Sequence, residues 1–401
     1  MNAHDYSLQV RDWISASVQA GPLLSFSDLV STLPGVHPND IARELAALGN
    51  VTLAQDSPSI DIRPEPHAIE LPVPHPLDFD WRFTPETINY VFHRISSLNH
   101  NPQGLCFLGA PTLFRAAHER GISSPCYLID ASATSAKALK NTAPQSIFVT
   151  DLLNGPIPNL QVAVTVADPP WYEEFVRAFL WAAAQLVQPG GFVFLSFPPL
   201  GTRPLIEEEW SRTEEFAQQL GLTVTEQTGA LKYVSPPFEQ NALRAAQHKY
   251  VHAHWRPGIL VLLEKTGECR ISRPAAQSDR EQWIEQSLLG VRWRFRRQHL
   301  ADGHPLLNEL VSGDILNSVS RRDLRRTSAD VWTSGNRIYR CQNTTHLALI
   351  AKALAAGIRP DTYVSAHLGR ELTQPEDEIT LLAAKQLATI TSRELREYLL
   401  N

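Results

Sequence analysis

The stretch Asp168-Pro169-Pro170-Trp171 places a carboxylate, two rigid prolines and an indole directly after an apolar run. An exocyclic amino group of a nucleobase is a weak nucleophile, because its lone pair is delocalised into the ring. A carboxylate and a backbone carbonyl that both accept its N–H groups draw the nitrogen towards tetrahedral geometry and stabilise the charge that forms during methyl transfer. We therefore expect Asp168 and the Pro169 carbonyl to position an amine. Pro170 would keep the turn rigid, and Trp171 would stack on the base, which is worth about 1–3 kcal/mol.

Three other turns carry residue types that suit a nucleoside with a charged tail. Gly109 allows close backbone approach before a predicted helix N-terminus, which favours a ligand carboxylate such as that of methionine. Asp130 is placed to accept hydrogen bonds from ribose hydroxyls, and Asp151 to accept one from an adenine amino group. The predicted cofactor-binding residues are Gly109, Ala110, Pro111, Thr112, Asp130, Asp151 and Leu152.

These turns belong to a segment, residues 82–266, in which strand-like and helix-like runs alternate. Such alternation is typical of a parallel sheet with helices on both faces, where ligands bind beyond the carboxyl ends of the strands. Seven apolar runs are expected to be strands, so the predicted fold class is α/β, a seven-stranded Rossmann-like methyltransferase domain. The runs cover 105–110, 126–131, 146–151, 161–170, 190–197, 222–227 and 258–266.

The flanking regions have different patterns. Residues 1–60 predict three short helices and a strand, the outline of a winged-helix-like module, and residues 61–81 predict a proline-rich linker. Residues 267–401 form a C-terminal region that we expect to be mostly helical. Its segment 291–340 holds ten arginines interleaved with aromatic side chains.

Arginine next to tryptophan and tyrosine can grip phosphates and stack on bases, so this arginine-rich region is a candidate nucleic-acid contact. A solvated helix face and a contact to a neighbouring domain are the alternative interpretations. The stretch Ser235–Phe238 repeats the proline-aromatic pattern and is expected to line the substrate side. The predicted substrate-binding residues are Tyr172, Ser235, Phe238, Arg296 and Arg297.

The motif "ADPPW" resembles the (D/N/S)-P-P-(Y/F/W) motif of amino-group methyltransferases, especially the N6-adenine enzymes. "CFLGAPTLF" followed by "YLID" is similar to the subgroup whose first motif is a "GTP" or "STP" turn. The resemblance covers residues 82–266 and implies S-adenosylmethionine as the cofactor and adenine N6 in RNA or DNA as the acceptor.

A second resemblance joins "FTPETINYVFHRI" and the N-terminal helices to the branched-chain polyamine synthases, which carry the same motif and transfer an aminopropyl group. Their first loop is rich in acids, whereas here it is Ala110-Pro111-Thr112, so the ordinary methyl donor is favoured. A catalytically inactive methyltransferase-fold scaffold that binds nucleic acid or protein is the third hypothesis.

Composition narrows the class of protein further. The 401-residue chain has a net charge of −6 and four scattered cysteines without a CxxC pair, which fits a reduced cytoplasmic protein. No signal peptide or membrane span is expected. The histidines of "HKYVHAHW" stand near no cysteine or carboxylate, so no metal site is predicted.

Overall fold

The described residues form two compact units. The computed structural model describes residues 3–20, 23–33, 35–56, 70–98, 103–140, 143–199, 201–248, 251, 254–276, 282–297 and 303–399. The first unit comprises Met1–Pro72, Trp81–Ser235 and Tyr250–Ser278; the second comprises Val73–Asp80, Pro236–Lys249 and Asp279–Asn401. Most of the expected linker, residues 61–69, lies outside the described residues. Its last part, Val73–Asp80, belongs to the second unit.

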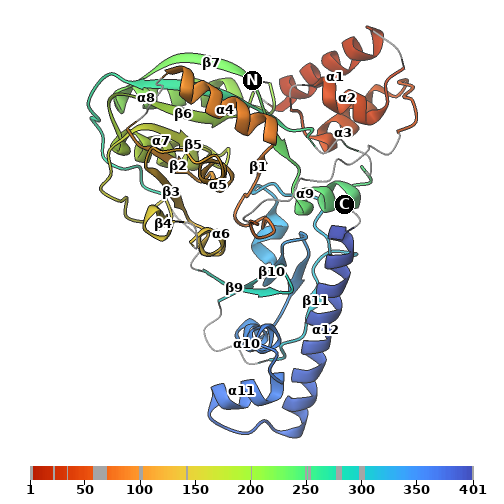
Figure 1. Cartoon of the computed structure of the whole chain (residues 1–401). Helices are drawn as coiled ribbons and strands as arrows, with labels where there is room; N and C mark the ends of the chain where they lie inside the picture. Colours follow the sequence, from red (N-terminus) through yellow and green to blue (C-terminus); the bar gives the residue numbers. More distant parts are fainter. Residues whose placement is uncertain are drawn as a thin grey trace. The chain divides into compact units, whose positions relative to one another are not determined.

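The N-terminal segment of the first unit contains the three predicted helices, α1 (Ala3–Gln19), α2 (Phe26–Thr32) and α3 (Pro38–Leu48) (Figure 1). Helix α2 begins where Ser25 and Asp28 form a reciprocal capping box, which satisfies two of the orphan N–H groups at its start. In place of the expected strand, Ala54 makes an isolated parallel bridge to Ser25. The winged-helix assignment therefore remains a proposal.

The larger segment of the first unit is a mixed sheet with the order β1-β7-β8-β6-β5-β2-β3-β4. Strands β2 to β6 pair in parallel, and β8, β7 and β1 continue the sheet antiparallel. The strands are β1 (Arg82–Phe83), β2 (Leu105–Leu108), β3 (Cys126–Asp130), β4 (Ile147–Val149), β5 (Val162–Ala167), β6 (Val187–Phe197), β7 (Leu222–Val234) and β8 (Pro257–Lys265).

Each of the seven predicted strand runs forms a strand, but the sheet of the described residues has eight. The additional strand is β1, two residues long, which pairs Arg82 with Val234 and Phe83 with Tyr233. So short a strand leaves no alternating pattern in the sequence, because its position depends on a partner about 150 residues away.

Helices cover both faces of this sheet because its central strands are apolar on both sides. Phe107 packs with α4, α5 and α6 on one face, whereas the neighbouring Cys106 and Leu108 pack with α7 and α8 on the other. These helices are α4 (Pro85–Leu98), α5 (Pro111–Glu119), α6 (Ala133–Leu139), α7 (Glu173–Leu186) and α8 (Ile206–Gln219), with a short 3₁₀ turn at Pro144–Ser146 (Figure 1). This layering fixes the carboxyl ends of β2 to β5 at one edge.

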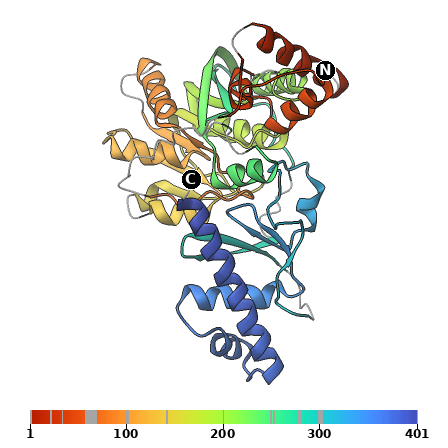
Figure 2. The ribbon, with the colours of Figure 1, turned by 90° about the vertical axis from the view of Figure 1, so that its right-hand side faces the viewer.

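The second unit contains a five-stranded antiparallel sheet that the sequence did not predict, with the order β11-β13-β12-β10-β9. Helix α12 runs along this sheet (Figure 2). The C-terminal helices agree with the expected helical character, but the arginine-rich segment itself forms strands. The elements are α9 (Pro237–Ala245), β9 (Trp283–Leu288), β10 (Val291–Arg296), β11 (Asn308–Glu309), a 3₁₀ turn at Leu324–Ser328, β12 (Val331–Thr333), β13 (Ile338–Arg340), α10 (Thr344–Ala355), α11 (Pro360–Leu368) and α12 (Gln374–Leu399).

Strand β10 shows how part of the arginine-rich segment is accommodated in the second unit. Trp293 and Phe295 enter the apolar core of the second unit, and Arg292, which directly precedes Trp293, is fully buried. The Arg292 guanidinium lies 2.5 Å from Asp78 and 2.9 Å from Glu285, so its charge is compensated inside the unit. Four of the ten arginines are buried, namely Arg292, Arg294, Arg326 and Arg337. These four are internal ion-pair or stacking residues and cannot contact a nucleic acid.

Candidate functional site

The site is built at the edge of the sheet where β2, β3, β4 and β5 end. Parallel pairing sets Leu108 opposite both Ile129 and Ala167, so the turns that follow these strands start at the same level. The Asp168 backbone N–H donates to the Leu108 carbonyl at 3.0 Å, and that of Gly109 donates to the Ile129 carbonyl at 2.9 Å. The structure thus brings together the turn at Asp168, predicted to bind the acceptor amine, and the turn at Gly109, predicted to bind the methyl donor (the donor turn).

Gly109 lies where these two turns approach each other closely. Its φ is +63°, and a Cβ built on it would lie 3.1 Å from the Asp168 carbonyl oxygen and 2.9 Å from Cε1 of Phe179. A residue with a side chain would be strained and crowded here, which accounts for glycine. Helix α5 begins two residues later, with Pro111 in its first turn and no side-chain cap. The positive end of the dipole of α5 therefore lies at this turn and favours negative charge.

The two aspartates that were predicted to bind the cofactor, Asp130 and Asp151, stabilise the turns that follow their strands. One carboxylate oxygen of Asp130 accepts the N–H of Ser132 at 2.6 Å, and one of Asp151 accepts the N–H of Leu153 at 3.0 Å. Both aspartates are half-buried at the edge of the sheet. The predicted neighbour Leu152 is 3% exposed and packs in the core, so its side chain is structural.

Two hydroxyl groups orient the carboxylate of Asp168. Its Oδ1 accepts hydrogen bonds from Ser196 Oγ at 2.5 Å and from the Tyr233 hydroxyl at 2.7 Å. Both donors are buried, Ser196 on β6 and Tyr233 on β7. Burial, followed by the nearby charge of Asp168, raises the pKa of Tyr233 well above its ordinary value. Tyr233 therefore remains a protonated donor throughout the physiological pH range.

Trp171 lies among aromatic and cationic neighbours. Its ring centroid is 5.5 Å from that of Tyr233, with the ring planes at 86°, an edge-to-face arrangement. The guanidinium carbon of Arg256 lies 5.1 Å from the Trp171 centroid and 4.6 Å from that of Trp81. These contacts fix the indole beside Asp168. They also mean that one face of Trp171 meets a guanidinium, which the sequence did not indicate.

The predicted substrate-binding residues have different environments. Tyr172 is half-buried at the start of α7, with its ring 6.5 Å from that of Phe175. Ser235 and Phe238 are buried, at 2% and 1% exposed, and their role as substrate-binding residues stays a prediction. Arg296 and Arg297 belong to the second unit, where the guanidinium of Arg296 lies 4.7 Å above the ring of Trp283. Their role stays a prediction.

Sequence reasoning missed Ser196, Tyr233, Arg256 and Arg273. Arg273 donates to the carbonyls of Leu152 and Gly155, at 2.6 and 2.5 Å, and so holds the turn that follows Asp151. A signal existed only for Ser196 and Tyr233, because each lies at or just before a second proline-proline pair in the chain.

Neither a metal cluster nor a membrane helix is found in the described part of the chain. No three His, Cys, Asp or Glu side chains within it come together as metal ligands, and His252 of the histidine-rich stretch lies outside it. Among the helices described, none is both long and apolar enough to cross a lipid bilayer.

The strand order defines an α/β fold of the methyltransferase type, and the turns predicted to bind ligands gather at one edge of its sheet. The chain is similar to the branched-chain polyamine synthase from Thermus thermophilus, with 16% identity and a TM-score of 0.52 over 70% of this chain and 97% of that one. A mutein of that synthase gives 14% identity and a TM-score of 0.51 over the same shares. Both structures hold N4-aminopropylspermidine and 5'-methylthioadenosine. At these identities the likeness establishes the fold alone.

A 16S rRNA methyltransferase from the same organism gives 14% identity and a TM-score of 0.28 over 48% of this chain and 42% of that one. No family model matches the sequence, and no curated protein matches it.

Proposed function

We propose that the chain is an S-adenosylmethionine-dependent methyltransferase that acts on an amino nitrogen, adenine N6 in RNA or DNA. The observation that carries the proposal is the position of Asp168. Its carboxylate is oriented by Ser196 and Tyr233, and its backbone lies against the Gly109 turn. An amine held at this carboxylate would lie beside a donor held at that turn.

The donor turn suits a ligand with a carboxylate tail. Gly109 permits close backbone approach, and the N-terminus of α5 favours negative charge. Ala110, Pro111 and Thr112 are buried and bring no carboxylate to this turn, so a donor ending in a cationic propylamine would find no counter-charge in it. Asp130 would bind the ribose hydroxyls and Asp151 the adenine amino group.

S-adenosylmethionine, when bound, supplies a methyl group that its sulfonium makes electrophilic. Asp168 and the Pro169 carbonyl would each accept an N–H of the acceptor amine. Together the two hydrogen bonds would direct the nitrogen lone pair at that methyl carbon. The new N–C bond forms as the C–S bond breaks, and the amine proton passes to water. Methyl transfer from a sulfonium needs no strong base, and none is assigned.

The decisive experiment separates donor binding from transfer. Asp168→Ala should abolish methylation of adenine-containing RNA and DNA, while calorimetry shows donor affinity within about threefold of wild type, because Asp168 serves the acceptor. Asp130→Ala is the matched aspartate variant and should weaken donor binding. Turnover retained in Asp168→Ala would contradict the proposal, and so would an absence of binding heat at millimolar S-adenosylmethionine.

Aminopropyl transfer to polyamines is a second candidate, which the fold shared with the Thermus thermophilus synthase supports. The two candidates differ in the donor. Competition between S-adenosylmethionine and its decarboxylated form should favour the carboxylate-bearing donor if methyl transfer is correct. Steeply salt-dependent nucleic-acid binding without any donor binding would instead support the inactive scaffold.

A further inference from the structure

Arg273 lies in the segment that follows β8, and its guanidinium spans the turn at residues 151–155 (the Asp151 turn). One terminal nitrogen donates to the Gly155 carbonyl at 2.5 Å, and the other donates to the Leu152 carbonyl at 2.6 Å. The two N–H groups belong to one rigid, planar guanidinium, so they also fix the distance between the two carbonyls. Arg273 therefore restrains the shape of the whole turn.

The shape of the Asp151 turn and the direction of the Asp151 carboxylate depend on each other. One carboxylate oxygen of Asp151 accepts the N–H of Leu153 at 3.0 Å, and the Asp151 carbonyl accepts the N–H of Gly155 at 2.6 Å. A Cβ at Gly155 would collide with Thr150 Oγ1 and lie 2.9 Å from the Asp151 carbonyl, so the turn is closely packed on its inner side. A change in the backbone of the turn therefore moves the carboxylate.

Arg273 is itself held in place by helix α7. Its guanidinium carbon lies 5.3 Å from the ring centroid of Trp181, a cation–π contact, and Trp181 packs against the core on this face of the sheet. Burial lowers the pKa of Arg273, and the charge of Asp151 acts in the opposite direction. An arginine stays charged in proteins, so a fixed cation joins the Asp151 turn to α7.

We propose that Arg273 is a positioning residue for the methyl donor, because it holds the Asp151 turn in the shape that directs the Asp151 carboxylate at the adenine amino group. This inference rests on the donor site of the proposed function, in which Asp151 binds that amino group. It adds a residue outside 82–266, the range expected to form the methyltransferase domain. Arg273 acts through Asp151 and not by contact with the donor.

The test compares two ligands that differ at the edge of the base. Calorimetry on the full chain measures the Kd of S-adenosylhomocysteine and of S-inosylhomocysteine, in which a carbonyl oxygen replaces the amino group. Wild type should prefer S-adenosylhomocysteine by about 10- to 100-fold, because only the amino group can donate to a carboxylate. Arg273→Gln should reduce this preference to about threefold or less, mainly through weaker binding of S-adenosylhomocysteine. Arg273→Lys keeps the charge without the planar fork and should give an intermediate preference.

A double-mutant cycle shows whether Arg273 acts through Asp151. Asp151→Ala should lose the same preference for S-adenosylhomocysteine. Adding Arg273→Gln to Asp151→Ala should weaken binding by no more than about twofold beyond Asp151→Ala alone, because a residue that acts through a second one has no effect once that one is removed. Losses that multiply in the double variant would overturn the inference.

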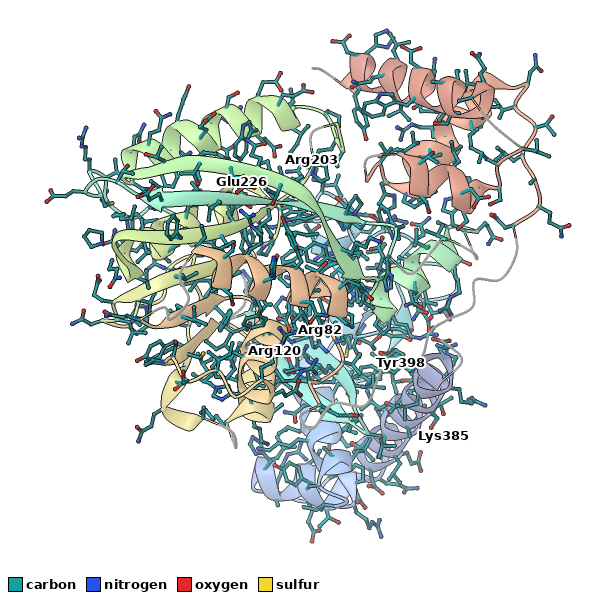
Figure 3. The ribbon with its side chains drawn as sticks, turned by 45° about the horizontal axis from the view of Figure 1, so that its top comes forward. Arg82, Arg120, Arg203, Glu226, Lys385 and Tyr398 are labelled. Carbon is teal, nitrogen blue, oxygen red and sulfur yellow. The ribbon has the colours of Figure 1, made fainter. Side chains whose placement is uncertain are left out.

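Lys265 and Arg120 provide two matched controls in the same unit. The Lys265 ammonium also bridges two backbone carbonyls, those of Ala184 and Leu220, at 3.1 and 2.8 Å, but it lies at the opposite edge of the sheet. Arg120 also stacks on an aromatic ring, 4.6 Å from the centroid of Phe92 (Figure 3). Lys265→Gln and Arg120→Gln should leave the preference within about twofold of wild type, whatever their effect on the urea midpoint.

The outcomes also separate this inference from the proposed function. If wild type binds S-adenosylhomocysteine but methylates no acceptor, the proposed function fails, and a preference that depends on Arg273 still supports the inference. If wild type methylates an acceptor but Arg273→Gln keeps the full preference, the inference alone is overturned. It is also overturned if wild type binds neither ligand, if it binds both equally, or if Lys265→Gln or Arg120→Gln loses the preference as Arg273→Gln does.

Discussion

Replacing Gly109 by alanine tests whether the donor turn and the acceptor turn are packed as tightly as the structure indicates. At φ +63° a residue with a Cβ costs about 1–2 kcal/mol more than in an ordinary conformation. The new methyl group would also lie 2.9 Å from Phe179 and 3.1 Å from the Asp168 carbonyl, and such overpacking costs about 1–3 kcal/mol. We expect Gly109→Ala to lower the free energy of unfolding by about 2–5 kcal/mol.

Gly190 provides the control within the same sheet. It has φ +76°, and a Cβ built there meets nothing within 4 Å, so Gly190→Ala pays the conformational cost without the crowding. Urea unfolding followed by tryptophan fluorescence should therefore show Gly109→Ala less stable than Gly190→Ala by about 1–3 kcal/mol. The donor affinity should fall only in Gly109→Ala, because Gly190 is remote from the site edge. Equal losses of stability in the two variants would refute the close approach of the two turns.

Two further predictions concern hydrogen bonds and protonation. Tyr233→Phe removes one donor to Asp168 and should lower kcat about 10- to 100-fold at unchanged donor affinity, since hydrogen bonds to charged groups are worth about 1.5–3 kcal/mol; single-turnover rates equal to wild type would contradict this. His75 is fully buried, and burial followed by the charges of Arg294 and Arg292 holds its pKa well below the ordinary value. Its contribution to stability is thus present above the unfolded pKa of about 6.5 and is lost as the pH falls below that value, by at most about 1.4 kcal/mol per pH unit. The urea concentration at the unfolding midpoint should fall less steeply with decreasing pH in His75→Gln than in wild type. Equal pH dependence of the midpoint in the two proteins would exclude His75 as the cause of the loss of stability.

The sequence predicted the core of the first unit because strand-to-helix alternation is a local pattern. Runs such as "LCFL" and "VAVTVA" are buried on both faces, and each is followed by a turn and an amphipathic helix. Parallel strands end at a common edge, so the order of these runs was enough to expect Gly109 and Asp168 near one another. The pairing of β2 with β5 confirms that proximity.

The parts that were not predicted depend on contacts between distant segments. Tyr233 reaches Asp168 only because β7 returns antiparallel beside β8, and nothing near position 233 indicates an acidic partner 65 residues earlier. Arg292 belongs to the segment that was a candidate nucleic-acid contact, and an arginine is rarely buried without a partner. Its partner Asp78 lies 214 residues away, in a segment expected to be a linker. Local patterning cannot distinguish a solvated arginine from one paired in this way.

The kind of group that orients Asp168 bears directly on the proposed chemistry. The carboxylate has to keep its negative charge and point in a defined direction if it is to accept the N–H of an amine. Ser196 and Tyr233 contribute neutral O–H donors, which fix the direction of the carboxylate without cancelling its charge, and both lie on strands of the sheet and not on loops. Preorganised donors of this kind do not have to rearrange as charge develops on the acceptor. Their protonation is secure, because a serine hydroxyl does not titrate and the pKa of Tyr233 is raised well above its ordinary value. A site arranged in this way is suited to hold an amine for attack over a wide pH range, and it gives a reason for a buried tyrosine opposite an aspartate that packing alone would not require.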